Sequence, residues 1–283
     1  MNITPSLSIG IPGGEGRTGG QFARLFRSRG FTVDVTGYGS RQRNPELLQQ
    51  CDVVIFAFPL EESVKLIEEE IVHAIRPDQL LLDVSSLKGK QVEMTLRGKG
   101  EVIGMHPLFA PTTDPENQTI MLCPTRSEEE TVLSLEQTFQ KMGLKTIRKT
   151  PEEHDRLMAF IQALPHLKSL LMADTLRQSG ADIGEIEALC TPAYEIELNV
   201  IGRFLDDDPS LYGPIILQNP QTLQLLKTLR SLLDEYLKMA ETTDLAAFHK
   251  KYDSLRAFFG PITAYARTRS EACIRTLSSL KTS

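Results

Sequence analysis

The stretch that decides the fold runs from Leu7 to Arg29 and reads LSIGIPGGEGRTGGQFARLFRSR. A short apolar run ends at Ile11, glycines follow in the pattern G-x-G-x-x-G, and a helical segment begins at Gln21. Glycines are needed there because the chain must turn tightly, let its backbone approach a pyrophosphate and pack a helix closely on a strand. The phosphate then rests on the N-terminal end of the helix. The residues predicted to contact a dinucleotide are Gly14, Gly16, Arg17, Thr18 and Gly19.

Three further strand-like runs follow, at Phe31 to Thr36, Asp52 to Phe58 and Gln79 to Val84, separated by polar or helical stretches such as Glu61 to Ile75. Their alternation with helical segments predicts a parallel sheet. The runs DVVIFAF and LLLDV are nearly continuous in apolar residues, as a strand covered by helices on both faces requires. One more strand, helix and strand, over residues 119–148, complete an α/β Rossmann-like domain that we place at residues 1–150.

Two polar motifs fall at strand ends. The first is Ser85-Ser86-Leu87-Lys88, and the second is His106 in the stretch EVIGMHPLFAP, residues 101–111. Proline after the histidine biases His106 toward an extended conformation, so its imidazole should be held at the end of a strand. Ligands of parallel sheets lie beyond the carboxyl ends of the strands, so the two motifs should converge on one crevice. The alternative is a histidine that merely caps a strand, with a serine that caps a turn or helix.

The end of the second strand, residues 36–43, reads TGYGSRQR and lacks the Asp or Glu that usually binds the adenosine ribose hydroxyls of NAD. Ser40, Arg41 and Arg43 suit a 2′-phosphate instead. We therefore expect NADP as cofactor, with NAD as the alternative. Asp34 is the competing carboxylate but sits in mid-strand, and the arginines could equally be solvated loop residues.

Beyond Thr150-Pro151 the composition changes, and Leu-rich helical periodicity continues through Lys281 without an alternating strand pattern. We expect an all-helical domain over residues 151–283. One segment spaces its leucines by three or four residues, which gives a broad apolar stripe suited to a core or to a homodimer interface. That stripe comprises Leu223, Leu226, Leu229, Leu233 and Leu237.

Two polar stripes lie within the helical half. If each segment is one α-helix, residues spaced by four align on one face and could reach a ligand. The other interpretation of each is an ordinary water-facing side. The stripes are His154, Met158, Gln162 and His166, with Pro165 expected to kink the helix, and Glu195, Asn199 and Arg203, on a helix that starts at Thr191-Pro192.

Bulk composition narrows the class of protein. Hydrophobic residues at 41%, charged residues at 24% and a formal charge of -6 are ordinary for a soluble protein and give no basic footprint for nucleic acid. The longest apolar run, Val53 to Phe58, is too short to span a bilayer, and the N-terminus lacks a signal-peptide pattern, so we expect a cytoplasmic protein. Four scattered cysteines argue against a metal site, a redox dithiol or a disulfide framework.

Five separated motifs, in order, resemble the prephenate dehydrogenase family, and in particular the dehydrogenase part of bacterial bifunctional chorismate mutase/prephenate dehydrogenase. They are GGEGRTGGQFARLF, DVSSLKG, GMHPLFAP, EEHDRLMAFIQALPH and TPAYEIELNVIGRFLDDDPSLY, and they cover nearly the whole chain. The resemblance implies oxidative decarboxylation of prephenate to 4-hydroxyphenylpyruvate, with hydride transfer to NAD(P)+, in tyrosine biosynthesis.

The resemblance also implies site residues. Ser86 and His106 match the family's active-site serine and histidine, and Arg203 matches the arginine that binds a substrate carboxylate. Further substrate-binding positions of the family are matched by Gln162, His166 and Lys88. Ser85 is predicted to contact the cofactor, as are Ser40 and Arg41. Glu195 departs from the family, because close relatives have arginine there.

The substrate prediction is prephenate. Asn199 lies one helical turn from Arg203, and a neutral amide serves a keto group without demanding the ammonium of arogenate. Arogenate or 4-amino-4-deoxyprephenate is the alternative substrate. A non-catalytic dinucleotide-sensing protein is the alternative of another class, although a sensor would not need His106 and Arg203 together.

Overall fold

The computed structural model describes residues 1–59 and 72–280, which form two compact units. The first unit comprises Met1–Ile161 and Gly213–Asn219, and the second comprises Gln162–Tyr212 and the chain from Pro220 onward. The predicted division into domains at residue 150 stays a prediction. Most of the helical stretch expected from Glu61 to Ile75 lies outside the described residues.

A seven-stranded sheet forms the centre of the first unit, in the order β2-β1-β3-β4-β5-β6-β7. All neighbouring strands run parallel except β5 and β6, which pair antiparallel. The predicted Rossmann-like sheet is confirmed, with one reversed strand pair near its edge. The strands are β1 (Ser8–Pro12), β2 (Thr32–Thr36), β3 (Val53–Phe56), β4 (Leu80–Asp83), β5 (Glu101–Pro107), β6 (Thr119–Arg126) and β7 (Lys145–Arg148).

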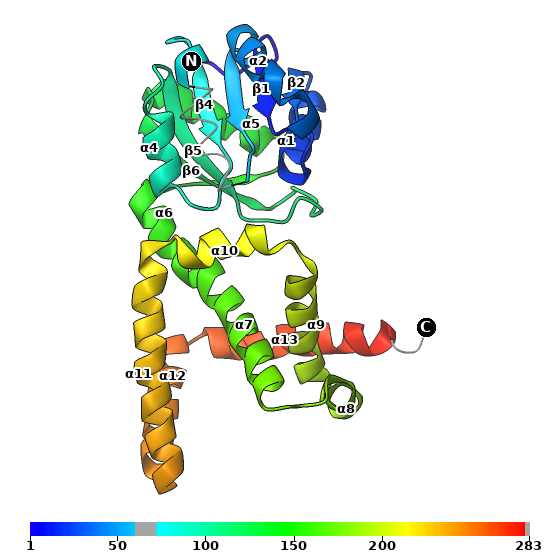
Figure 1. Ribbon diagram of the computed structural model, residues 1–283, viewed down its shortest axis with the longest axis vertical. Helices are drawn as coiled ribbons and strands as arrows, with labels where there is room; N and C mark the ends of the chain where they lie inside the picture. The colour runs from blue at the N-terminus through cyan, green and yellow to red at the C-terminus, as the bar shows by residue number, and fades with distance from the viewer. Residues whose placement is uncertain (60–71, 281–283) are drawn as a thin grey trace. The chain divides into compact units, whose positions relative to one another are not determined.

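Helices cover both faces of this sheet. Successive residues of a strand point to opposite sides, so each central strand contributes side chains to two cores. Ile55 and Leu82 pack in one core with side chains of α1 (Arg17–Arg27) and α5 (Glu129–Lys141). Val54 and Leu81 pack in the other core with α2 (Asn44–Gln50) and α4 (Gly89–Thr95). Figure 1 shows the sheet lying among these helices. The central strands are therefore buried on both faces, which requires the continuous apolar runs in their sequence. Two 3-10 turns, η1 (Tyr38–Arg43) and η3 (Val72–Ala74), also belong to this unit.

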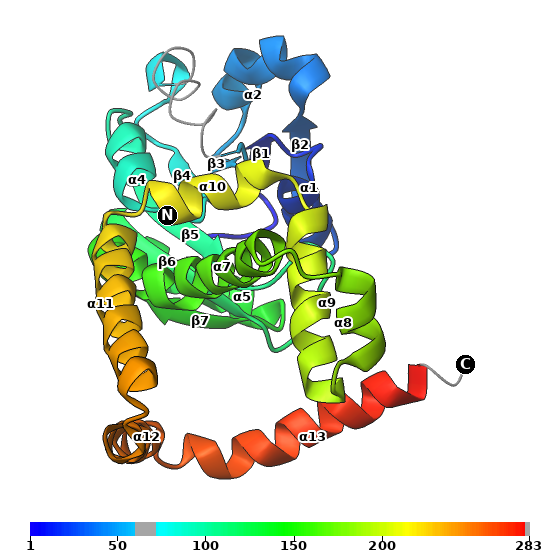
Figure 2. The same ribbon diagram turned by 60° about the horizontal axis from the view of Figure 1, so that its bottom comes forward.

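The second unit is helical throughout its described residues, as predicted. Helix α9 contacts both α7 and α13, while α11, α12 and α13 follow one another end to end (Figure 2). Within residues 1–59 and 72–280, no helix is long and apolar enough to cross a membrane. The helices after β7 are α6 (Pro151–Met158), α7 (Leu164–Gln178), α8 (Ile183–Leu189), α9 (Pro192–Asp206), α10 (Pro209–Leu217), α11 (Pro220–Thr242), α12 (Leu245–Phe259) and α13 (Ile262–Leu280).

The predicted stripe of His154, Met158, Gln162 and His166 is not one α-helical face. A π-helical segment, Ala159–Ala163, separates α6 from α7. A π-turn bonds residue i to i+5 and so breaks the four-residue alignment. The sequence predicts a kink at Pro165, and the interruption in the structure is the π-helical segment that ends two residues before this proline, which is the second residue of α7.

Helix α6 begins with a reciprocal cap, and we expect this cap to be measurable. The Thr150 hydroxyl accepts a hydrogen bond from the Glu153 amide at 3.2 Å, and the Glu153 carboxylate accepts one from the Thr150 amide at 3.0 Å. Thr150→Ala should lower the free energy of unfolding by about 1 kcal/mol in chemical denaturation. Thr150→Ser keeps the hydroxyl and is the control. Equal stability of the two variants would contradict a role for the cap.

Candidate active site

The glycine-rich loop joins β1 to α1 in a conformation that side chains would obstruct. Gly13 has a φ of +82°, in the left-handed region that favours glycine. A Cβ added at Gly19 would lie 2.5 Å from the Gly13 carbonyl oxygen, and one added at Gly14 would lie 2.7 Å from the Ile11 carbonyl oxygen. The close backbone packing predicted from the motif is therefore present. It fits a dinucleotide whose phosphates approach the backbone at the start of α1.

The N-terminus of α1 carries the other residues predicted for the cofactor. Helix α1 starts at Arg17 and Thr18, after Gly16 as N-cap. Among the described residues, no side chain at the N-cap accepts a hydrogen bond from the first amides of this helix. The N-terminal end of α1 therefore keeps the positive partial charge of the helix dipole. Such an end favours an anion, which supports the phosphate position predicted from the sequence.

His106 and the serine loop lie at the same edge of the sheet as this glycine-rich loop. Strands β4 and β5 are parallel neighbours in which Asp83 pairs with Gly104. Ser85 lies two residues after the end of β4, and His106 lies two residues beyond Gly104 on β5. The structure therefore brings the two strand-end motifs together, as the parallel sheet predicts.

His106 belongs to a chain of buried hydrogen bonds that the sequence analysis missed. Its Nδ1 lies 2.8 Å from Nε2 of His154, and Nδ1 of His154 lies 2.8 Å from Oδ1 of Asp155. A carboxylate only accepts, so His154 carries its proton on Nδ1 and accepts at Nε2. His106 must then donate from Nδ1. This assigns the basic nitrogen of His106 to Nε2.

The surroundings of both histidines keep them neutral. Burial lowers the pKa of His106 well below its ordinary 6.5, and His154 and the ammonium of Lys88 lower it further. Burial also lowers the pKa of His154, against the opposing effect of its hydrogen bond to Asp155. A neutral imidazole at His106 is the form that a general base requires.

Asp155 anchors the far end of this chain. Its carboxylate accepts hydrogen bonds from the backbone amides of Lys88 and Gly89 at 2.8 and 2.9 Å, besides the one from His154. Burial raises the pKa of the Asp155 carboxyl, but these hydrogen bonds outweigh burial and leave it below the ordinary value. Asp155 is therefore ionised, as the proton position on His154 requires.

The side chains of Lys88 and Ser85 belong to a second buried network, beside the first. The Lys88 ammonium is fully buried, 2.5 Å from Oδ1 of Asp83 and 3.2 Å from the Ser85 hydroxyl. The Ser85 hydroxyl donates to Asp83 and lies 2.7 Å from the Leu87 carbonyl oxygen. Through these contacts both side chains stabilise the loop after β4. That Lys88 also contacts the substrate, and Ser85 the cofactor, stays a prediction. Ser86 lies in the same loop and is half-buried.

At the end of β2, the three residues predicted for a 2′-phosphate lie on η1. The Ser40 hydroxyl donates to the Glu15 carboxylate at 3.0 Å. Arg43 is paired with Asp34 at 3.3 Å. Arg41 is partly buried beside them. Two of the three predicted phosphate ligands are therefore bonded to carboxylates.

In the second unit, His166 and Arg203 lie together beside an aromatic cluster. The His166 ring stacks on Phe204 with 5.3 Å between centroids and lies 4.6 Å from the Tyr212 ring. Burial and the Arg203 guanidinium lower the pKa of His166, so it is neutral beside the cation. A guanidinium beside aromatic rings suits a carboxylate whose apolar part packs on those rings.

Helix α9 carries the second predicted stripe as an unbroken α-helix. Its N-cap is Thr191, whose hydroxyl accepts from the Tyr194 amide, and Pro192 follows in the first turn, as predicted. Glu195, Asn199 and Arg203 therefore align along one side of it. Gln162, by contrast, lies in the π-helical segment.

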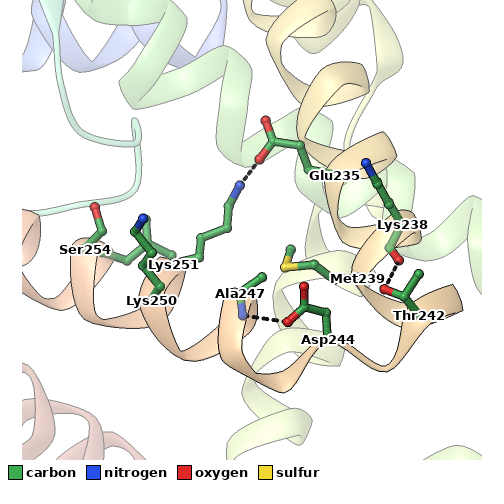
Figure 3. Close-up of a pocket in the computed structure, with 10 residues that line it drawn as sticks. Glu235, Lys238, Met239, Thr242, Asp244, Ala247, Lys250, Lys251 and Ser254 are labelled. Atoms are coloured by element: carbon green, nitrogen blue, oxygen red, sulfur yellow. Dashed lines mark hydrogen bonds and ion pairs between the residues drawn. The ribbon is translucent and has the colours of Figure 1, made fainter.

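A hollow of about 650 Å³ lies between α11 and α12 (Figure 3). Met239 and Leu255 line it together with the ion pair of Glu235 and Lys251. None of the residues predicted for catalysis or binding lines this hollow. It has neither a histidine nor a cysteine in its wall, so its chemistry gives no reason to place the reaction there.

Sequence reasoning missed Asp155 and Asp83 as parts of the site, and it placed His154 on a stripe facing a ligand without predicting its contact with His106. The dipeptide His154-Asp155 was a usable signal, because a carboxylate beside a histidine can fix its tautomer. Asp83 is the last residue of an apolar strand, and a charge that ends such a strand needs a partner.

Comparison with known proteins assigns both halves of the chain to one family. The family described as prephenate dehydrogenase, nucleotide-binding domain, matches residues 36–148, and prephenate dehydrogenase, dimerization domain, matches residues 150–259. The second match supports the predicted homodimer.

Individual relatives agree with this assignment. The T-protein of Haemophilus influenzae is 30% identical over 275 residues, which cover 96% of this chain and 72% of that protein. A probable arogenate/prephenate dehydrogenase of Methanocaldococcus jannaschii is also 30% identical, over 90% of this chain and 61% of the relative.

Solved structures share the fold. The crystal structure of prephenate dehydrogenase from A. aeolicus in complex with hydroxyphenyl propionate and NAD+ has a TM-score of 0.69 at 19% identity, over 90% of this chain and 98% of that one. Together with the glycine-rich loop, these similarities make the chain an oxidoreductase that uses a nicotinamide dinucleotide. The chain belongs to the prephenate dehydrogenase family.

Proposed function

We propose that the chain catalyses the oxidative decarboxylation of prephenate to 4-hydroxyphenylpyruvate, in tyrosine biosynthesis. The observation that carries this proposal is the hydrogen-bond chain Asp155–His154–His106, which leaves a neutral imidazole with a basic Nε2 at the end of β5. A protein that only senses a dinucleotide has no use for a buried base of this kind. The names of the relatives support the same reaction.

His106 is the general base in this proposal. Its Nε2 accepts the proton of the substrate 4-hydroxyl as the carbonyl develops, and it returns that proton to the oxygen when loss of carbon dioxide makes the ring aromatic. Bound at the glycine-rich loop, a nicotinamide dinucleotide supplies the acceptor for the hydride from C4. Ser86, half-buried in the loop after β4, orients the hydroxyl. General-base assistance typically contributes about 10²- to 10⁴-fold.

Arg203 is the proposed ligand of a substrate carboxylate. Its guanidinium is a planar fork that can bond both carboxylate oxygens at once, which an ammonium cannot do. His166, held neutral beside Arg203, adds a hydrogen-bonding group without a second charge. The neighbouring rings of Phe204 and Tyr212 give an apolar surface for the substrate ring.

Prephenate is favoured over arogenate by the residue nearest to Arg203 on the polar stripe of α9. Asn199 lies one turn away and offers a neutral amide that serves a keto group. Glu195 lies a further turn away, about 12 Å from the level of Arg203 at a rise of about 1.5 Å per residue. That distance is too long for Glu195 to act at the ring. The objection to prephenate is that a carboxylate at this distance suits the substrate side chain, where it would attract the ammonium of arogenate.

The cofactor preference that we propose is NAD. The prediction of NADP depends on Ser40, Arg41 and Arg43 being available to a 2′-phosphate. Ser40 is bonded to Glu15 and Arg43 to Asp34, so a phosphate there would meet two carboxylates as well as two arginines. The prediction of NADP requires an excess of positive charge at this position. The carboxylates of Glu15 and Asp34 offset that charge.

We also propose that the homodimer forms through the leucine stripe of α11. Leu223, Leu233 and Leu237 are each more than half exposed on this 23-residue helix. Exposed leucines that recur along one helix are common at protein interfaces. A second copy of the chain would cover them.

Turnover with prephenate is expected to be faster than with arogenate. The purified protein would be given each compound with NAD+ and with NADP+, and reduced nicotinamide followed by absorbance. Faster turnover of arogenate would contradict the assignment of substrate. A Glu195→Gln variant that then shifted the ratio toward prephenate would identify the carboxylate responsible.

His106→Asn should lower kcat by about two to four orders of magnitude and leave KM within a few-fold, because the lost interaction forms mainly in the transition state. The exposed His73 offers a matched control, since His73→Asn makes the same change away from β5. Near-normal kcat in a folded His106→Asn protein would remove His106 from the mechanism.

The same base sets the pH profile of the unmodified enzyme. Because the pKa of His106 is lowered, its imidazole is still unprotonated at pH 6.5. The value of kcat/KM should therefore remain level as the pH falls to 6.5 and decrease only at more acid pH. A fall centred at or above 6.5 would mean that another group is titrating.

Arg203→Ala should chiefly raise KM for the substrate, because a charge-assisted contact to a carboxylate stabilises ground and transition states alike. Steady-state kinetics with the substrate and the cofactor varied separately would measure this. Arg177→Ala is the control, since Arg177 is exposed on α7 and paired only locally with Asp174. A raised cofactor KM with unchanged substrate KM would place Arg203 in the wrong site.

A further inference from the structure

A carboxylate does lie at the tip of β2, although none occurs there in the sequence. Glu15 belongs to the glycine-rich loop, between Gly14 and Gly16, and its backbone amide lies 3.4 Å from the carbonyl oxygen of Thr36, the last residue of β2. Its side chain extends over Gly37, the next residue. Strands β1 and β2 end side by side, with Pro12 paired to Thr36, so the loop after β1 can reach this tip.

The position of Glu15 is fixed from two sides. Its Oε1 accepts a hydrogen bond from the Ser40 hydroxyl at 3.0 Å, and that hydroxyl in turn accepts one from the Gly37 amide at 2.9 Å. Its Oε2 lies so close over Gly37 that a Cβ added there would overlap it, and the same Cβ would be 2.7 Å from Cβ of Glu15. Gly37 has an ordinary extended conformation, with φ of −137°, so the glycine serves the packing of Glu15 rather than a backbone strain.

We propose that Glu15 binds the adenosine ribose hydroxyls and makes the enzyme select NAD over NADP. In dinucleotide-binding folds the ribose lies beside the tip of the second strand, where a carboxylate accepts hydrogen bonds from its hydroxyls. Glu15 is exposed and places its carboxylate at that tip from the neighbouring loop. Since a 2′-phosphate is itself an anion, the same carboxylate repels NADP, and the repulsive element adds to the discrimination.

Two arginines also lie at the tip. Arg43 is engaged by Asp34, so that pair brings no net positive charge, and Arg41 is partly buried beside it on η1. Ser40 holds Glu15 and does not offer its proton to a phosphate. The inference rests on the proposed dehydrogenase function only through the use of a nicotinamide cofactor, so binding alone can test it.

Binding of NADH and NADPH to the purified full chain would be measured by the fluorescence of the reduced nicotinamide, without substrate. The unmodified protein should bind NADH more tightly than NADPH by about tenfold or more. Glu15→Gln keeps the size of the side chain and removes its charge. It should reduce that ratio by about tenfold to a hundredfold, the usual effect of losing one charge-assisted hydrogen bond.

Two further variants separate the explanations. Glu46→Gln makes the same charge change on α2, where Glu46 bonds only Gln50 among the described residues, and it should leave the ratio unchanged. Gly37→Ala displaces Glu15 without altering its charge and should reduce the ratio as Glu15→Gln does. Tighter binding of NADPH by the unmodified protein, or an unchanged ratio in Glu15→Gln, would overturn the inference.

Turnover distinguishes failure of this inference from failure of the proposed function. If the unmodified protein selects NADH but oxidises neither prephenate nor arogenate, the reaction is wrong and the role of Glu15 stands. If it oxidises prephenate with a ratio of NAD to NADP use that Glu15→Gln does not alter, the reaction stands and Glu15 is not the selecting residue.

Discussion

The carboxylate of Asp155 is the constraint on which the first unit's site depends. It accepts three hydrogen bonds, from the ring of His154 and from the amides of Lys88 and Gly89, and so ties α6 to the loop after β4. Those amides begin α4, where a carboxylate also meets the positive end of a helix. One side chain therefore positions the loop that carries Ser86 and sets the tautomer of the histidine that meets His106. Structure and proton position are controlled by the same group.

The ion pair of Lys88 and Asp83 has an electrostatic consequence beyond its packing. Both side chains are almost completely buried, so their attraction must offset a large loss of hydration, and removing either one would leave an unpaired buried charge. The ammonium also contributes to the low pKa of His106. A cation near a base disfavours its protonated form. The pair thus holds the loop after β4 and keeps the adjacent imidazole able to accept a proton.

The sequence predicts what depends on local pattern and misses what depends on contacts between distant segments. Apolar runs gave the buried strands, the glycines gave the turn between β1 and α1, and Thr191-Pro192 gave the start of α9, since each is a property of neighbouring residues. The π-helical segment after Met158 left no such mark, and it broke the alignment inferred from four-residue spacing. The contact between His106 and His154 joins residues 48 apart, so no spacing rule could give it.

The end of β2 shows why a motif rule tied to sequence position can overlook a charged side chain. The ribose requires a carboxylate at a position in space beside the tip of the second strand. A residue that directly follows that strand is the usual one to supply it, but a neighbouring loop can supply it as well. In this chain Gly37 occupies the sequence position, and its missing side chain is the condition that lets Glu15 occupy the place. Two residues 22 apart thus act as one unit, because a larger residue at the first would expel the second. Cofactor selection in this fold should therefore be judged from every side chain that can reach the tip, and a glycine there is a reason to look for a carboxylate in the loop beside it.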